Sequence, residues 1–226
     1  IGSLVLIVFL FSFFNEVIIA PFIQPSRIAA ATPIIVDANT VAPSATPEVI
    51  IPKINVEIPV IYGQTSTNEA SIETALEDGV VHYPTTVKPG ELGNAAFFGH
   101  SSNNIFNKGK YKFAFVLLHS LIPGDTFYLT TDSKVYVYKV ISKTIVPPTE
   151  VCGLGPFPGQ TATATLITCD PPGTSANRLI VVGQQISPDP AGNVTVASTN
   201  TPIATPATLP SNGPTLFGRF MSTAIG

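Results

Sequence analysis

Residues 162–186 read ATATLITCDPPGTSANRLIVVGQQI, two apolar runs separated by a loop that is rich in proline and glycine. The runs, 162–169 and 178–186, have the length and the β-branched content of strands. Turn-forming residues bound each run. The stretch therefore predicts two successive strands, with Cys169 at the end of the first and Arg178 at the start of the second.

The sequence upstream of this stretch repeats the pattern of short runs between turns. Residues 49–62 form two β-rich runs that Pro52 and Pro59 interrupt, as expected of strands at a sheet edge. Residues 95–101 (AAFFGHS) have the composition of a buried strand. Two alternating runs, TFYLTTD and KVYVYKVISKTIV, meet at Asp132-Ser133, which suggests a hairpin.

Helical signals are few and short. Asn68 to Asp78 reads NEASIETALED, which has a good N-cap at its start and an apolar stripe along one face. Residues 111–121 can form a second short helix. Many short strands with two minor helices predict a mainly β fold, a closed or nearly closed β-barrel of about eight strands with one or two short helices.

The two flanks differ from this region. Residues 1–23 are apolar except for Glu16, and they predict a transmembrane helix whose start precedes the first residue; a cleaved signal peptide is the alternative. Residues 24–47 predict a Pro/Thr/Ala-rich stalk, and residues 188–226 a Pro/Thr/Ser-rich tail. The barrel domain is thus expected over residues 48–187.

Composition argues against several classes of site. With 11 basic and 14 acidic residues and no basic stripe, the chain is not expected to bind nucleic acid. Three histidines and two cysteines lack the spacing of a zinc site, and Glu91, Asp125 and Glu150 make no dense cluster for calcium, so we expect no metal and no cofactor. Cys152 and Cys169 do not form a disulfide framework, although a single bridge between them stays open.

Three side chains of complementary chemistry stand at predicted strand ends: Cys169, Arg178 and His100. A thiolate can attack a carbonyl carbon, an imidazole can protonate a leaving amine, and a fixed cation can hold developing negative charge. Thr168 and Ser101 are their neighbours and can add hydrogen bonds. By itself such a cysteine is more often a buried apolar residue, and such an arginine part of an ion pair.

Four stretches resemble the sortase family in the expected order: IPKINVEIPV, HYPTTVKPGELGNAAFFGHS, LIPGDTFYLTTDSKVYVYKV and TLITCDPPGTSANRLIVVGQ. The last contains the TLxTC signature of the family and its downstream arginine. The match covers about residues 50–186. It places the nucleophile of the family on Cys169, its histidine on His100 and its arginine on Arg178, and it implies the sortase type of β-barrel.

The resemblance also implies an activity. A sortase-like enzyme is a membrane-anchored cysteine transpeptidase that cleaves a C-terminal sorting signal similar to Leu-Pro-x-Thr-Gly through a thioacyl intermediate. The acceptor would be the amine of a peptidoglycan precursor or of a pilin lysine. The protein would cross the plasma membrane once, with its catalytic domain on the extracellular face. No lid-like aromatic segment precedes the barrel, which favours a lidless, class D- or class E-like enzyme. A hydrolytic cysteine peptidase and a non-catalytic surface module are the alternatives.

Four further features take no catalytic role in this match. Cys152 lies in a Gly/Pro loop, His82 is expected to be structural, and His119 is expected in a solvated turn. Residues 209–213 read LPSNG, which resembles a sorting signal with asparagine in place of threonine. A linker is the default interpretation of this tail, and self-processing is kept as a hypothesis.

Overall fold

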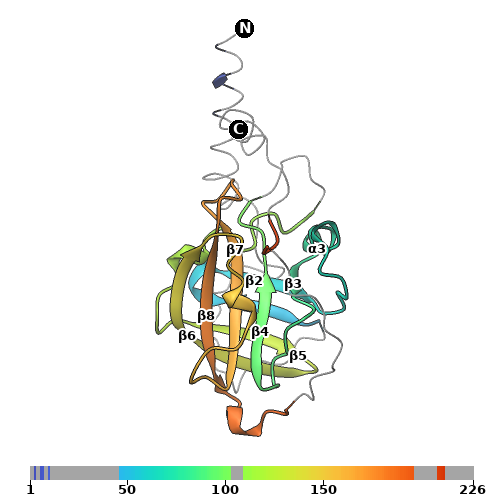
Figure 1. The fold of residues 1–226 in the computed structure, drawn as a ribbon, viewed down its shortest axis with the longest axis vertical. Coiled ribbons are helices and arrows are strands. Elements are labelled where there is room, and N and C mark those ends of the chain that lie inside the picture. Colours follow the sequence, from blue (N-terminus) through green and yellow to red (C-terminus); the bar gives the residue numbers. More distant parts are fainter. Residues whose placement is uncertain are drawn as a thin grey trace.

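The computed structural model describes residues 46–102, 109–195 and 208–211, together with residues 3, 6, 7 and 10. The described residues form eight strands, which close into one barrel in the order β1-β2-β3-β4-β7-β8-β6-β5 (Figure 1). Pairing of β1 with β5 completes the ring. The strands are β1 (Glu48–Ile51), β2 (Val56–Ile61), β3 (Val80–His82), β4 (Gly93–Phe98), β5 (Thr126–Thr131), β6 (Lys134–Val146), β7 (Ala162–Asp170) and β8 (Asn177–Ser187). The prediction of a mainly β, closed barrel is confirmed.

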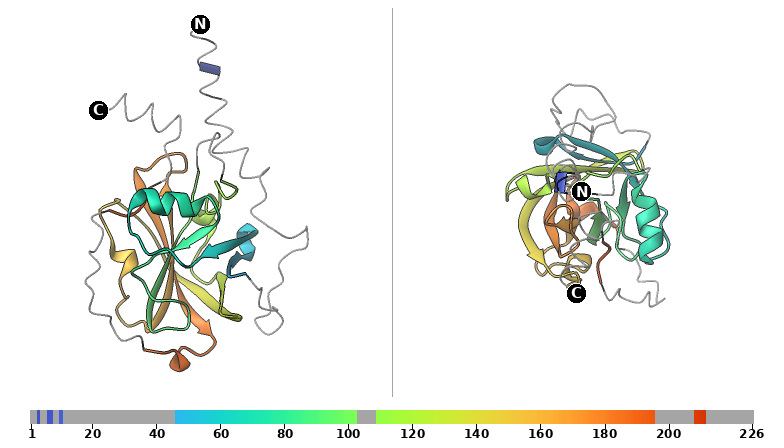
Figure 2. Two further views of the ribbon diagram at one scale, coloured as in Figure 1. Left: turned by 90° about the vertical axis from the view of Figure 1, so that its right-hand side faces the viewer. Right: turned by 90° about the horizontal axis from the view of Figure 1, so that it is seen from above.

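Two of the strand pairs are parallel, and they need long connections. The β2–β3 pair is joined through α3 (Glu69–Leu76), which packs on the outside of the barrel (Figure 2). The β4–β7 pair sets residues 93–98 beside residues 162–167. A tight hairpin cannot join parallel neighbours, so each pair needs a longer connection. Helix α3 lies between β2 and β3, and strands β5 and β6 of the same barrel lie between β4 and β7. The β4–β7 pairing brings the two stretches that carry His100 and Cys169 together.

The helix forms where the sequence predicts it. The Asn68 side chain accepts a hydrogen bond of 3.0 Å from the backbone N–H of Ala70, which caps the first turn. Ile72 and Leu76 are buried on the face that α3 turns toward the barrel. This face packs mainly on β3 and shares an apolar cluster with Phe98 of β4 and Ile167 of β7.

The second short helix, over residues 111–121, does not form as an α-helix. Its backbone makes i to i+3 bonds, such as Leu118 N–H to Phe115 O at 3.0 Å, and only the short 3-10 helix η3 (Leu118–Ser120) is regular. Phe113, Ala114, Phe115 and Val116 are all buried, and no α-helix that lies on a surface can bury four successive side chains. Tertiary burial overrides the helical pattern here.

The strand predictions hold at the hairpin and change at Pro59. Asp132 and Ser133 have φ of 49° and 57° between β5 and β6, the left-handed values of a two-residue hairpin turn. Pro59 does not interrupt a strand, because it lies inside β2 opposite Glu48. The neighbouring bond from Val60 N–H to Pro47 O, 2.7 Å long, indicates that the nitrogen of Pro59 faces away from β1, so its missing N–H removes no bond of that ladder.

Alternate residues of the strands fill two separate apolar clusters. One cluster fills the barrel interior and includes Phe97, Leu166 and Val181. The other lies on the outer face, under α3, and includes Phe98 and Ile167. Because strand side chains alternate between faces, residues 98, 167 and 169 share the outer face.

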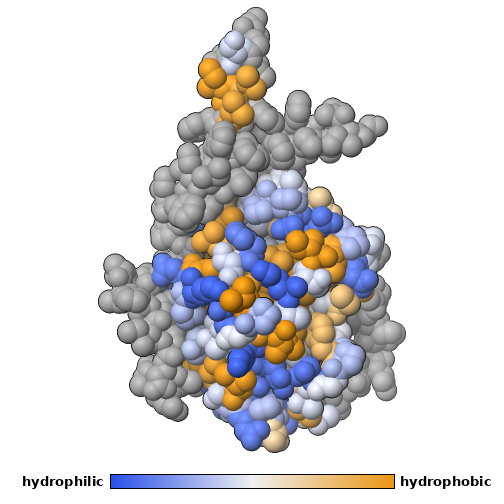
Figure 3. Space-filling view, turned by 90° about the vertical axis from the view of Figure 1, so that its left-hand side faces the viewer, coloured by the Kyte–Doolittle hydropathy of each residue, from blue (hydrophilic) through white to orange (hydrophobic). Residues whose placement is uncertain are grey.

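The remaining surface and the flanks carry less information. On the face that Figure 3 shows, apolar and polar side chains intermingle. Ile141 and Ile145 of β6, which are exposed apolar residues, are separated by three polar residues. Single exposed apolar residues of this kind are ordinary. The predicted stalk, apart from residues 46 and 47, and all but four residues of the predicted anchor lie outside the described residues. Within the described part of the chain, no helix is long and apolar enough to span a bilayer.

Candidate active site

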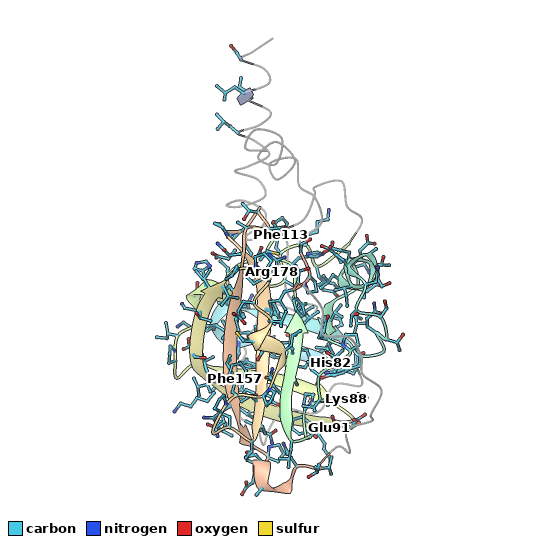
Figure 4. The ribbon with its side chains drawn as sticks, viewed as in Figure 1. His82, Lys88, Glu91, Phe113, Phe157 and Arg178 are labelled. Carbon is cyan, nitrogen blue, oxygen red and sulfur yellow. The ribbon has the colours of Figure 1, made fainter. Side chains whose placement is uncertain are left out.

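Cys169 and Arg178 face each other across two neighbouring strands. Cys169 is the penultimate residue of β7, and Arg178 is the second residue of β8. The two are register partners in the antiparallel pair. Directly opposed residues place their side chains on the same face, here the outer one. The two residues are only 4% and 2% exposed. Figure 4 shows Arg178 near one end of the barrel, at the level where β7 and β8 join their loop.

His100 follows β4 by two residues and reaches the same place from the other side of β7. The backbone N–H of Gly99 donates to the carbonyl of Ile167 at 3.1 Å, which extends the β4–β7 pairing past the end of the strand. The carbonyl of His100 accepts from Phe115 N–H at 2.9 Å. His100 is 2% exposed. The backbone on both sides of the imidazole is therefore fixed.

One pocket is lined by both Cys169 and His100. It is lined by Leu76, Phe98, Gly99, His100, Thr168, Cys169, Pro210 and Ser211. The thiol and the imidazole thus open on one small cavity between β4, β7, α3 and the tail. Arg178 borders it through Pro210, whose carbonyl oxygen accepts from Arg178 Nε at 2.6 Å.

Of the two residues that the sequence offered as supports, Thr168 lines the pocket and Ser101 is outside its lining. The hydroxyl of Thr168 donates to the carbonyl of Gly99 at 2.7 Å. Ser101 is buried beside His100. Sequence reasoning missed Ser102, whose Oγ accepts from the N–H of Gly173 at 2.8 Å and so joins the loop after His100 to the loop after Cys169.

Glu73 of α3 is another residue that sequence reasoning missed. Its Oε2 lies 3.9 Å from Nε2 of His100. Burial, followed by repulsion from Glu69 and Glu77, raises the pKa of Glu73 from 4.5 to about 8, although Arg178 acts in the opposite direction. The carboxyl is therefore mostly neutral at pH 7, and its contact with His100 is a polar contact rather than an ion pair. Glu69, Glu73 and Glu77 follow one another at intervals of four residues. This spacing was the signal in the sequence that three acidic side chains share one helix face.

The guanidinium of Arg178 makes four hydrogen bonds to carbonyl oxygens. Nη1 donates to Ser175 at 3.0 Å and to Asn177 at 2.9 Å, which holds the group against its own loop. Nε donates to Pro210 at 2.6 Å and Nη2 to Leu209 at 3.1 Å. The planar fork of donors is thus oriented by the β7–β8 loop and used to hold a peptide backbone.

The other cysteine and the other histidines lie apart from the pocket lining. Cys152 is exposed on the 3-10 helix η4 (Cys152–Leu154), and both cysteines are free, so the disulfide alternative is wrong. Burial raises the pKa of the Cys152 thiol, and Glu150 adds to the effect. Burial also lowers the pKa of His82 to about 4, and its Nε2 lies 2.8 Å from Val87 O, so it is structural as expected (Figure 4). His119 is exposed in its turn.

The acidic loop residues have partners of their own. Asp125 pairs with Lys53 Nζ at 2.7 Å, Glu91 accepts from Lys88 N–H at 2.6 Å, and Glu150 accepts from Cys152 N–H at 3.3 Å. Across residues 46–102, 109–195 and 208–211, no group of three or more His, Cys, Asp or Glu side chains could hold a metal ion.

This arrangement suits nucleophilic acyl transfer. A thiol supplies a nucleophile, an imidazole at the same pocket supplies a proton acceptor and donor, and a buried guanidinium holds the backbone of a peptide next to them. The surrounding wall of Leu76 and Phe98 is apolar. Exclusion of water from such a pocket favours transfer of an acyl group to an amine over hydrolysis.

Comparisons with known proteins identify the family of the chain. The family model described as Sortase domain matches residues 49–186. Sortase SrtE1 of Streptomyces coelicolor is 31% identical over 153 residues, which cover 62% of this chain, and the match spans only 40% of that relative. Sortase C1 of Streptococcus suis is 32% identical, with a TM-score of 0.51 over 62% of this chain and 72% of that one.

A further solved structure gives the same result. The Streptococcus agalactiae sortase C1, determined in complex with MTSET, is 30% identical, with a TM-score of 0.51 over 62% of this chain and 66% of that one. The family match covers more than half of the chain, and its range includes every strand of the barrel except single residues at the two ends. The chain therefore belongs to the sortase family.

Proposed function

We propose that this protein is a cysteine transpeptidase that cleaves a sorting signal similar to Leu-Pro-x-Thr-Gly and joins the new carboxyl end to an amine. The supporting observation is the opposition of Cys169 and Arg178 across β7 and β8, with His100 lining the same pocket as the thiol. Nucleophile, proton carrier and backbone-holding cation thus stand at one place, as this chemistry requires.

In the first half of the reaction, Cys169 acts as the nucleophile. His100 first takes the proton of the Cys169 thiol. The sulfur then attacks the carbonyl carbon of the scissile bond, and an S–C bond forms as the carbonyl electrons move to oxygen. When the oxyanion collapses, the C–N bond breaks, and His100 gives a proton to the leaving amine. The product is a thioester on Cys169 and a released C-terminal fragment.

In the second half, an amine replaces the thiol. The amine nitrogen attacks the thioester carbon, and His100 takes a proton from it. As the C–S bond breaks, the sulfur leaves and takes this proton back from His100, which restores the thiol. Arg178 keeps the backbone of the bound signal aligned in both halves through its forked donors. Attack by water in place of the amine would make the enzyme a hydrolytic peptidase.

We extend the proposal to the substrates and to the location of the protein, with the sequence resemblance to sortases as its support. The donor would be a protein with a C-terminal sorting signal, and the acceptor the amine of a peptidoglycan precursor or of a pilin lysine. Residues 1–23 would anchor the protein in the plasma membrane, with the barrel outside the cell. A lidless, class D- or class E-like subclass is supported by the likeness to a sortase named SrtE1.

Trapping of the intermediate tests this function. We would incubate the protein, in a Cys152→Ser background, with peptides that vary the third and fifth positions of the signal, and detect the acyl adduct by intact mass and peptide mapping. An adduct on Cys169 supports the proposal. Folded protein that acylates with no peptide of the series contradicts it, because a sortase must form this thioester.

Product analysis then separates the two enzymatic outcomes. With triglycine or a lysine peptide present, transpeptidation gives a ligated product whose share rises with amine concentration. A peptidase gives only the free acid at every amine concentration. If Cys169→Ala supported full biological activity, the protein would instead act as a non-catalytic surface module.

A further inference from the structure

The C-terminal segment Thr208–Ser211 lies in the candidate active site of its own chain. In Figure 1 this segment (red) runs between the ends of β4 and β7 and helix α3. Pro210 and Ser211 line the same pocket as Cys169 and His100. The segment therefore lies in the pocket of Cys169 and His100, although it is distant from these residues in sequence.

The backbone of the segment is held at three points. The carbonyls of Leu209 and Pro210 accept from Nη2 and Nε of Arg178, at 3.1 and 2.6 Å. The N–H of Leu209 donates to Pro148 O at 2.8 Å. Proline has no N–H, so burial of Pro210 leaves no donor without a partner. Both carbonyls of this Leu-Pro dipeptide and its one N–H therefore have hydrogen-bond partners.

The side chains are held as well. Leu209 is 2% exposed and belongs to the outer apolar cluster, which includes Leu76, Phe98 and Ile167. The hydroxyl of Ser211 hydrogen-bonds to the carboxylate of Glu69 on α3. Burial of this apolar side chain favours the docked position of the tail. The pocket thus recognises leucine by shape and the next residues by backbone and hydroxyl contacts.

We propose that this tail segment is a resident ligand of the peptide-binding groove, which competes in cis with incoming sorting signals. The inference rests on the proposed function. Residues 209–213 read LPSNG, so the ligand that the groove holds has the Leu-Pro start of the signal that a sortase would bind. Nε of Arg178 has a single N–H, which Pro210 already uses, and Pro210 and Ser211 stand in the pocket beside Cys169, so tail and substrate exclude one another.

The length of the connection makes such competition effective even for a weak ligand. Twelve residues, 196–207, join Thr195 to Thr208 in the sequence. A tether of this length gives an effective concentration on the order of millimolar. A segment that binds in trans with a Kd near 0.1–1 mM would therefore raise the apparent KM of a substrate by about two- to ten-fold.

The test removes the tail contacts without touching Cys169, His100 or Arg178. Leu209→Asp places a charge where the buried leucine sits, and Thr208→Ala changes its exposed neighbour as the control. In a Cys152→Ser background, we would measure KM and kcat for a Leu-Pro-x-Thr-Gly peptide. We expect Leu209→Asp to lower KM about two- to ten-fold with kcat unchanged, and Thr208→Ala to leave both as they were.

A second measurement does not depend on turnover. The rate of alkylation of Cys169 by iodoacetamide reports access to the pocket, and it should rise by a similar factor in Leu209→Asp. A protein ending at Thr195 should behave like Leu209→Asp. If no sorting peptide is cleaved by any variant, the proposed function fails, but the alkylation rates still decide whether the tail fills the pocket.

Two results would overturn the inference. One is equal KM and equal alkylation rate in the parent, Leu209→Asp and the protein ending at Thr195, with unchanged thermal midpoints. The other is loss of the tail from the parent chain by mass spectrometry, without the same loss in Cys169→Ala. That result would make the tail a substrate that is processed and not a competitor that stays.

Discussion

The hydroxyl of Thr168 donates a hydrogen bond of 2.7 Å to the carbonyl oxygen of Gly99, and this bond joins the residue before Cys169 to the residue before His100. The N–H of Gly99 meanwhile donates to the carbonyl of Ile167 at 3.1 Å. A Cβ on Gly99 would lie 2.6 Å from the Phe115 ring, so the backbone passes there with no room for a side chain. The relative position of thiol and imidazole is thus set by β7 itself.

Replacement of Thr168 by valine tests this connection. Valine keeps the shape but leaves the buried carbonyl of Gly99 without this donor, so we expect a loss of about 1–3 kcal/mol in the free energy of unfolding. A displaced His100 should lower kcat by roughly ten-fold, since small errors in alignment are costly. Urea unfolding and peptide-cleavage kinetics measure the two effects. Thr168→Ser, which restores the hydroxyl, should recover most of both; a serine variant as impaired as the valine variant would count against the bond.

Replacement of Arg178 by lysine should impair the enzyme although the charge is kept. Lysine cannot supply the fork that reaches both Leu209 and Pro210 in the tail, and by extension both carbonyls of a bound signal. Loss of one charge-assisted bond corresponds to about ten- to a hundred-fold in kcat/KM. Cleavage kinetics measure this, with Lys53→Arg as a distant control. Full activity of the lysine variant would show that the fork is dispensable.

Substitutions of the two cysteines should have clearly different effects on turnover. Cys169→Ala removes the nucleophile, so turnover should fall by at least about 1,000-fold. Cys152→Ser changes an exposed loop residue and should alter kcat/KM by no more than about two-fold. The same peptide-cleavage assay and thermal denaturation serve for both. The assignment of the nucleophile is wrong if the serine variant is the inactive one.

The raised pKa of Glu73 predicts a particular dependence of stability on pH. The folded protein keeps a proton on Glu73 up to about pH 8, whereas the unfolded chain releases it near 4.5. The free energy of unfolding should therefore contain a contribution that is present below pH 4.5 and is lost as pH rises to about 8. Glu73→Gln removes it, so the variant should gain stability relative to the parent mostly at pH 8. Urea unfolding at pH 5 and pH 8 gives the answer, and parallel profiles of the two proteins would contradict it.

The lowered pKa of His82 predicts the opposite dependence of stability on pH, in the acidic range. Its pKa falls to about 4 in the folded protein because the ring is buried, so the unfolded chain takes up a proton first as pH drops below 6.5. Stability from this group is present above pH 6.5 and is lost as pH falls toward 4. His82→Gln retains a donor for Val87 O and should flatten the profile over this range. Thermal unfolding between pH 4 and pH 7 compares the two, and an unchanged slope would exclude His82 as its cause.

Much of the fold could be read from local pattern. Alternation of apolar residues marks β7 and β8, the Asp132-Ser133 pair marks the hairpin, and Asn68 marks the start of α3, because each signal depends on residues only a few positions apart. The burial of residues 111–121 could not be read in this way. Their conformation depends on contacts such as the bond from Phe115 N–H to His100 O, which local propensity does not contain.

The sequence alone determined the candidate residues, since Cys169, His100 and Arg178 were identifiable from a motif and from their places at strand ends. Tertiary structure decided which groups surround them. The parallel β4–β7 pairing joins segments about 70 residues apart, α3 adds Glu73, and the tail adds Leu209 and Pro210. These contacts are non-local, and their free energy comes from burial and from hydrogen bonds that exist only once the barrel has closed.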